Sequence, residues 1–182
     1  MHPTGPGQEP AQLTSDRALL AEAIASETPT LGVCLGAELC TQAKGGQVEK
    51  LPSIEVGWAE VRLTKEGIAD PLIGPMGDSF LGFEWHSYGC RIPEDCELLA
   101  LSDSSPQAWR LGPKAWGIQF HAEVTLQDAL SWLKSWSNDP DALASGLDPR
   151  IIEEQTRERI STWNDLGRDL ARRFLEIASA SE

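Results

Sequence analysis

The chain has 182 residues, 41% of them hydrophobic and 24% charged, which is typical of one soluble globular domain with a sizeable core. Acidic side chains outnumber basic ones by 28 to 15, and a formal net charge of −13 argues against binding to the phosphates of nucleic acid. No stretch has the length of a membrane span, and the first residues, MHPTGPGQEPAQL, lack the features of a secretory signal. We therefore expect a cytoplasmic protein that binds neither nucleic acid nor a membrane.

The N-terminal part of the chain predicts a loop, a helix and a strand. Residues 1–13 are rich in Pro, Gly and Gln and indicate a loop. Apolar residues follow one helical stripe in 14–27, which predicts a helix capped by Thr14 or Ser15. The short apolar run TLGV, residues 30–33, is typical of a buried parallel strand.

A second helix and a β-rich segment follow. Residues 35–44 have a helical composition, and the pair Gly45-Gly46 should end that helix. Five strands are then predicted, at 57–64, 79–89, 96–102, 107–111 and 115–121. The sequence LGPK between the last two strands predicts a hairpin turn.

Helical patterns return after Thr125. Residues 126–136 are amphipathic, and a long helix is predicted from Pro149 onward. Its apolar residues recur at three- and four-residue steps and should contact the core: Ile160, Trp163, Leu166, Leu170, Phe174 and Ile177. We expect an α/β main domain over 1–127 and a helical C-terminal extension over 128–182 that packs on the same domain.

The segment TPTLGVCLGAELC, residues 28–40, holds a cysteine between two glycines at the junction of a strand and a helix. This arrangement predicts a nucleophile elbow, a tight turn in which side chains at Gly32 and Gly36 would clash. The N-terminus of the following helix favours the thiolate form of Cys34. The backbone N–H of Leu35 would then face an oxyanion that develops during attack.

A candidate base lies in WGIQFHAEV, where His121 ends an apolar strand and Glu123 follows two residues later. Residues two apart on a strand project to the same side, so the carboxylate can hold the imidazole in the tautomer that accepts a thiol proton. The alternative is a solvated histidine just past a strand end. The cysteines match no zinc spacing, and we expect no metal, no other cofactor and inert thiols at most of the other three cysteines.

The segments LGVCLGAELC and WGIQFHAEVT together resemble the class I, or triad, glutamine amidotransferases, especially the stand-alone amidotransferases similar to GMP synthase. The resemblance covers most of residues 5–127 and implies a flavodoxin-like α/β fold. It implies that Cys34 is the nucleophile, His121 the base and Glu123 its orienting carboxylate. It also implies an oxyanion hole formed by the N–H of Leu35 and by Gly5, the glycine of a Gly-Pro-Gly loop.

The same resemblance points to residues that hold the substrate. FEWHSYG matches the segment that contacts the amino-acid end of glutamine, which implicates His86, Ser87 and Tyr88. A packing role is the equal alternative for His86. Glu38 stands where the family usually has a substrate-binding glutamine, and a carboxylate there would oppose the thiolate unless it is paired or protonated.

The implied reaction is hydrolysis of the glutamine side-chain amide through a γ-glutamyl thioester, with release of ammonia. Glutamine is the expected substrate, and a separate synthetase chain is the expected acceptor of the ammonia. Two alternatives stay open: a cysteine hydrolase of γ-glutamyl amides or peptides, and a catalytically impaired relative that acts as a binding module.

The sequence departs from the family at its start. Family members usually have several strand–helix units before the Gly-Pro-Gly loop, whereas TGPG lies at residues 4–7 here. We therefore expect an N-terminally truncated domain in which the strand at 30–33 exposes an unpaired edge. Such a chain is expected to form homo-oligomers or to aggregate, and to be weakly active.

Overall fold

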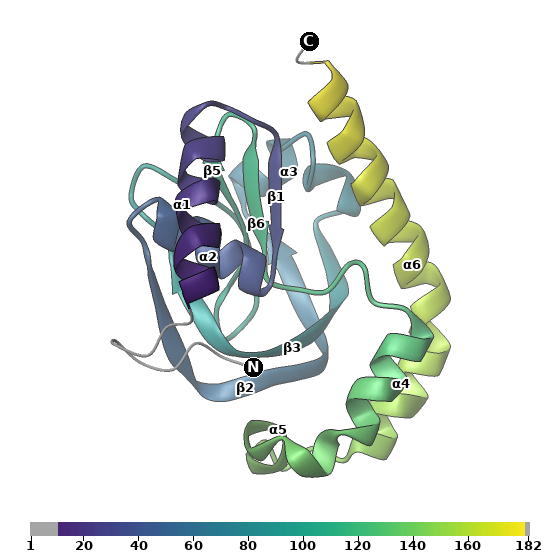
Figure 1. Ribbon diagram of the computed structural model, residues 1–182. Helices are drawn as coiled ribbons and strands as arrows, with labels where there is room; N and C mark the ends of the chain where they lie inside the picture. Colours follow the sequence, from purple (N-terminus) through teal and green to yellow (C-terminus); the bar gives the residue numbers. More distant parts are fainter. Residues whose placement is uncertain (1–10, 181–182) are drawn as a thin grey trace.

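The computed structural model describes residues 11–180 (Figure 1). Within this range, one six-stranded sheet has the strand order β1-β6-β5-β4-β2-β3. Its strands are β1 (Thr30–Val33), β2 (Gln47–Leu63), β3 (Ser79–Arg91), β4 (Glu97–Leu101), β5 (Pro106–Gly112) and β6 (Ala115–Ile118). The helices are α1 (Ala11–Ala25), α2 (Leu35–Ala43), α3 (Lys65–Ala69), α4 (Leu126–Lys134), α5 (Pro140–Ala144) and α6 (Pro149–Ser179), with 3-10 turns η1 (Gly74–Met76) and η2 (Trp136–Asn138).

Strand β1 forms one edge of the sheet and pairs in parallel with β6. The register places Thr30 opposite Ala115 and Val33 opposite Ile118, so the two strands end at the same level. The other strand pairs are antiparallel. The predicted parallel strand and hairpin turn are confirmed, and among residues 11–180 the outer edge of β1 has no strand partner.

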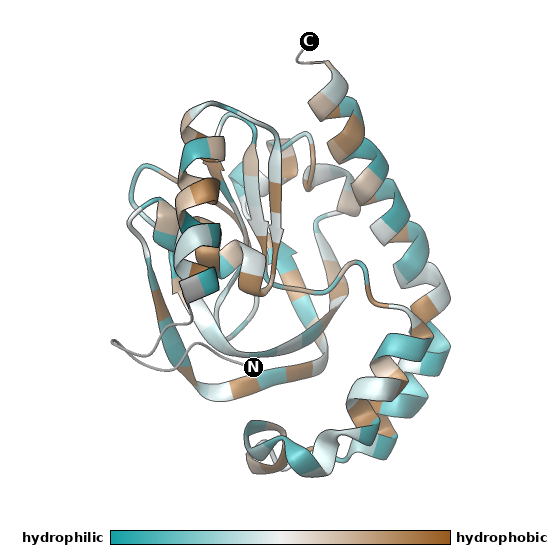
Figure 2. Cartoon of the chain, in the orientation of Figure 1, coloured by the Kyte–Doolittle hydropathy of each residue, from teal (hydrophilic) through white to brown (hydrophobic). Residues whose placement is uncertain are grey.

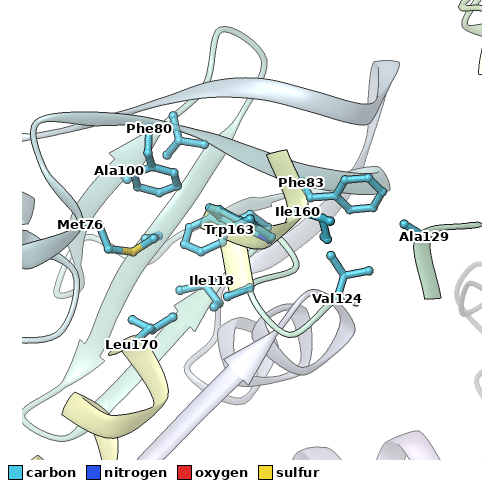
Figure 3. Close-up of a cluster of buried hydrophobic side chains, with 14 of the residues drawn as sticks. Met76, Phe80, Phe83, Ala100, Ile118, Val124, Ala129, Ile160, Trp163 and Leu170 are labelled. Carbon is cyan, nitrogen blue, oxygen red and sulfur yellow. The ribbon is translucent and has the colours of Figure 1, made fainter. Parts of the chain in front are cut away.

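Buried side chains cover both faces of the sheet, as alternation along the strands requires. Trp109 and Ala115 belong to a cluster with residues of α1 and α2, whereas their neighbours Ala108 and Trp116 belong to the larger cluster on the opposite face. Figure 3 shows Trp163 of α6 in the middle of that larger cluster. The fold is therefore a layered α/β arrangement with helices on both faces of the sheet.

The long C-terminal helix buries the stripe that the sequence predicts. Ile160, Trp163 and Leu170 are buried, and Leu166, Phe174 and Ile177 are partly buried against the same cluster. Hydrophobic and hydrophilic residues recur along α6 in Figure 2, as expected for an amphipathic helix. No helix within residues 11–180 has the length and apolar character needed to cross a membrane.

Three predicted element boundaries are wrong. The strand predicted over 115–121 ends at Ile118, so His121 and Glu123 follow the strand and do not share one of its faces. Helix α1 begins at Ala11, so neither Thr14 nor Ser15 is its cap; the Ser15 hydroxyl instead donates to the Gln12 carbonyl inside the helix, at 2.8 Å. Strand β2 begins at Gln47, ten residues before the predicted start at 57, because pairing with β3 supplies its hydrogen bonds despite a register irregularity after Lys50. Tertiary pairing overrides local propensity at such positions.

Candidate active site

Cys34 occupies a sharp turn between β1 and α2. Its backbone has φ of +50° and ψ of −111°, a conformation that non-glycine residues rarely adopt and that is found mostly at functional sites. Cys34 is also the residue before the first turn of α2, and its own N–H donates to the Ile118 carbonyl of β6, at 2.8 Å. The predicted strand–turn–helix arrangement is therefore present, with a half-buried thiol at its apex.

The two glycines that flank this cysteine differ in their surroundings. A Cβ at Gly32 would lie 2.6 Å from the Gly36 carbonyl oxygen and 2.7 Å from the Ala37 nitrogen, so the predicted clash is confirmed there. A Cβ at Gly36 would meet nothing within 4 Å among the described residues. Among residues 11–180, therefore, no neighbour explains a glycine at position 36 on steric grounds.

His121 and Glu123 follow the end of β6, beside the turn that carries Cys34. The His121 Nδ1 lies 2.6 Å from the Glu123 Oε1, and the imidazole packs edge-to-face on Trp132 with ring centroids 4.9 Å apart. Burial lowers the pKa of His121, but hydrogen bonds to Cys34 and Glu123 outweigh it and raise the pKa to about 9. The imidazole therefore links the thiol to the carboxylate.

These groups open onto a pocket of about 640 Å³. Cys34, Leu35 and His121 form part of its lining, with Trp85 from β3 and Trp132 from α4. Its remaining lining residues are Ile54, His86, Ser87, Ser135, Asn138, Asp139, Pro140 and Asp141. The pocket lies within the size range of small-molecule sites and combines aromatic walls with a few polar groups.

Residues 2–135 match the family model described as glutamine amidotransferase class-I. The chain belongs to this family. Among its relatives is the glutamine amidotransferase-like protein YfeJ of Salmonella typhimurium, 28% identical over 167 residues that cover 91% of this chain and 69% of that protein. GMP synthase of Marinobacter nauticus is 38% identical over 107 residues, 53% of this chain but 20% of the relative. The matching part of this chain therefore spans about a fifth of that GMP synthase.

Solved structures show the same fold. A glutamine amidotransferase from Thermotoga maritima superimposes with a TM-score of 0.78 at 25% identity, over 90% of this chain and 70% of that one. A glutamine amidotransferase from Methylobacillus flagellatus superimposes with a TM-score of 0.80 at 23% identity, over 96% and 73% of the two chains. The flavodoxin-like α/β fold that the resemblance implied is thereby confirmed.

In this member of the family, helix α6 contacts the loop that carries His121 and Glu123. The Trp163 Nε1 donates to the His121 carbonyl at 2.9 Å, and the Asn164 Nδ2 donates to the Val124 carbonyl at 2.7 Å. A Cβ at Gly167 would lie 2.1 Å from the Ala122 carbonyl oxygen. The apolar stripe correctly predicted that Trp163 is buried but did not predict these contacts, although a glycine inside a long helical pattern often marks a close approach.

His86 is part of the pocket lining, and its ring lies in a buried cluster of acidic side chains. Its Nε2 is 3.2 Å from the Glu84 Oε2 and 3.4 Å from the Glu55 Oε2, and its Nδ1 donates to the Tyr88 carbonyl at 2.8 Å. Burial alone would lower the pKa of His86, but the two carboxylates raise it to about 10. The His86 ring is fully buried, which supports a packing role for this residue over contact with substrate. The buried imidazolium is held in place by its carboxylate neighbours.

Only some of the residues implied for substrate binding line the pocket. His86 and Ser87 line the pocket, whereas Tyr88 and Glu38 are not among its lining residues. Glu38 is 2% exposed in the first turn of α2, and burial raises its pKa against the opposing effects of the His86 charge and a hydrogen bond with Gln119. Gly5 lies outside the described residues. Among residues 11–180, no three His, Cys, Asp or Glu side chains are grouped to hold a metal ion.

The buried imidazolium predicts that stability falls as the pH rises above neutrality. Unfolded His86 titrates near 6.5 and folded His86 near 10, so within that window the folded chain keeps a proton that the unfolded chain has lost. The stabilisation is complete below pH 6.5 and disappears through pH 10. His121, at about 9, acts in the same direction.

Urea unfolding at pH 6.5, 7.5 and 8.5 measures this dependence. We expect the free energy of unfolding to fall by on the order of 1 kcal/mol per pH unit for each histidine involved. NMR titration of the imidazole signals should show His86 still protonated at pH 8.5. A free energy of unfolding that stays constant or rises over this range would contradict the assignment of a buried imidazolium.

Proposed function

We propose that this chain hydrolyses the side-chain amide of glutamine with Cys34 as nucleophile, His121 as acid and base, and Glu123 as the group that orients the imidazole. One observation carries the proposal: His121 lies 2.6 Å from Glu123 and lines the same pocket as Cys34, whose side chain helps to raise the pKa of the imidazole. The exposed carboxylate occupies the Nδ1 side, which leaves Nε2 as the nitrogen for the thiol. Membership of the family supports the same reaction.

In the proposed first step, the Cys34 thiolate attacks the amide carbon of glutamine. The carbonyl oxygen becomes an oxyanion, which the N–H of Leu35 stabilises, since the first N–H groups of a helix have no partner within it. With a pKa of about 9, His121 is protonated at neutral pH and delivers that proton to the leaving nitrogen. The carbon–nitrogen bond breaks, ammonia departs and a γ-glutamyl thioester remains.

In the second step, water attacks the thioester. The neutral His121 left by the first step accepts a proton from that water, and the carbon–sulfur bond breaks. Glutamate leaves, and the thiolate and imidazolium are restored. The match to GMP synthase supports a synthetase as the acceptor of the ammonia, on a separate polypeptide or elsewhere in a longer one.

A second candidate substrate class is the γ-glutamyl amide or peptide. The pocket of about 640 Å³ favours this class because it extends past Cys34 to the aromatic and acidic side chains of Trp132 and Asp139. A substituent on the amide nitrogen would have room there. The same nucleophile, base and thioester would serve both substrate classes.

Ammonia release from glutamine tests the proposal, with γ-glutamyl peptides assayed in parallel for release of the free amine or amino acid. Hydrolysis of glutamine, lost in the Cys34→Ala variant, supports the amidotransferase assignment. Hydrolysis of the peptides alone supports the second class. A folded chain that hydrolyses neither would contradict both and leave a binding module.

A further inference from the structure

We propose that Gln119 is a positioning residue for the nucleophile: its side-chain amide donates to the Cys34 sulfur, and buried Glu38 orients that amide. This inference concerns the site of the proposed function and assigns roles to two residues that do not line the pocket. It replaces the direct substrate contact that the resemblance implied for Glu38.

The first observation is the approach of Gln119 to the thiol. The Gln119 Nε2 donates to the Cys34 Sγ at 3.7 Å, within the range for hydrogen bonds to sulfur. Gln119 is completely buried, and its own N–H donates to the Gln107 carbonyl at 2.9 Å, which fixes the backbone beside β5. The Phe120 side chain packs in the large core cluster, while its neighbours Gln119 and His121 both reach Cys34.

The second observation is the partner on the other side of the amide. Glu38 and Gln119 are both buried, and the interaction with this amide opposes the rise in the pKa of the Glu38 carboxyl group that burial causes. An amide nitrogen carries two hydrogens, so one can point at the sulfur and the other at a Glu38 oxygen. An ionised Glu38 carboxylate only accepts hydrogen bonds, so it faces the amide nitrogen, whereas the flipped amide would turn its oxygen toward both the carboxylate and the thiolate. Glu38 therefore selects the orientation in which the amide donates to sulfur.

The third observation is that Glu38 is itself held in place. It lies in the first turn of α2, is 2% exposed, and interacts with the positive charge of His86. His86 is fixed by the Tyr88 carbonyl and the Glu84 carboxylate. A buried polar network of this kind has few alternative arrangements, because each buried group left without a partner costs free energy.

The consequence is a second stabilising contact for the thiolate, in addition to the imidazole. A donor aimed at a charged acceptor forms a stronger hydrogen bond than one aimed at a neutral group, so the amide favours the thiolate over the thiol. Loss of this donor should lower the fraction of thiolate at neutral pH. It should have little effect at high pH, where formation of the thiolate no longer depends on this donor.

Alkylation of Cys34 by iodoacetamide measures this directly and requires no glutamine hydrolysis. The rate is followed from pH 6 to pH 10 on the Cys34 peptide by mass spectrometry. We expect Gln119→Leu to react about tenfold more slowly than the unaltered chain at pH 7 and at the same rate at pH 10. Gln119→Met keeps a side chain of similar length but has no N–H donor, so it should show the same shift even if Gln119→Leu folds poorly.

Gln107→Leu is the matched control, since Gln107 is a fully buried glutamine that donates to Glu55 at 2.9 Å and does not contact Cys34. Its alkylation profile should match that of the unaltered chain. Glu38→Gln should give an intermediate shift of about threefold at pH 7, because the amide of Gln119 loses the acceptor that orients it. Unchanged profiles for both Gln119 variants, or an equal shift in Gln107→Leu, would overturn the proposal. A shifted profile in a chain that leaves glutamine intact would instead contradict the proposed function alone.

Discussion

Replacing Cys34 with alanine is expected to lower the rate of glutamine hydrolysis at least about a thousandfold, because no other group at the site can form the thioester. The fold should survive, since the thiol is half-buried and alanine is smaller. Ammonia release measures the activity, and a thermal melt checks the fold. Cys34→Ser is the companion variant, because a hydroxyl keeps the shape of the side chain but is a far weaker nucleophile at neutral pH.

A glutamine-mimicking electrophile provides the second readout of the same prediction. It should label Cys34 and spare the other three thiols. Burial raises the pKa of Cys40 to about 11 and that of Cys90 to about 12, and burial together with the Asp95 charge raises that of Cys96 to about 11. Peptide mapping by mass spectrometry identifies the labelled site. Equal labelling of all four cysteines, or full activity in Cys34→Ala, would contradict the assignment of the nucleophile.

The second large effect is expected at a helix outside the predicted amidotransferase segment. Gly167→Ala should lower both stability and activity, because the new Cβ would lie 2.1 Å from the Ala122 carbonyl and must push α6 and the 121–124 loop apart. Overpacking of this kind costs about 1–3 kcal/mol of unfolding free energy. Displacement of His121 and Glu123 by a fraction of an ångström to 1 Å should lower glutamine hydrolysis by about ten- to a hundredfold.

Two variants on the same helix complete the test. Ser161→Ala changes an exposed residue and should leave stability and activity unaltered. Asn164→Ala removes the donor to the Val124 carbonyl without adding volume, so it should cost about 1 kcal/mol and a few-fold in activity. Urea unfolding and ammonia release measure both quantities. If Gly167→Ala retains full activity and stability, α6 is a cover for the sheet and does not position the loop.

Much of the candidate site was predictable from short stretches of sequence. The strand at 30–33, the turn at Cys34 and the helix after it follow one another without interruption, so local composition and two glycines were sufficient to predict the elbow. His121 and Glu123 are two residues apart, and their 2.6 Å contact is likewise local. The apolar stripe of α6 was predictable because its period depends on the helix alone.

The ends of α1 and β2 and the environment of Glu38 were not predictable in this way. Helix α1 already includes Ala11–Leu13, which precede the capping residue that the sequence predicted. Strand β2 extends back to Gln47 because β3 pairs with it there. Glu38 occupies a position implied for substrate contact, but the packing of α2 on the sheet buries it beside Gln119 and His86. Burial of a charge depends on which elements pack around it, and this information is spread over the whole chain.

The sequence by itself determined the elbow, the His–Glu pair and the amphipathic helix, because each depends on backbone angles and side-chain faces within a few consecutive residues. Only the tertiary structure shows how Cys34 and His121 come together: β1 and β6 are neighbours that end at the same level, although more than 80 residues separate them. It also placed Gln119 against the sulfur and α6 against the 121–124 loop. Contacts between distant segments arise from strand order and helix packing, which no local pattern encodes.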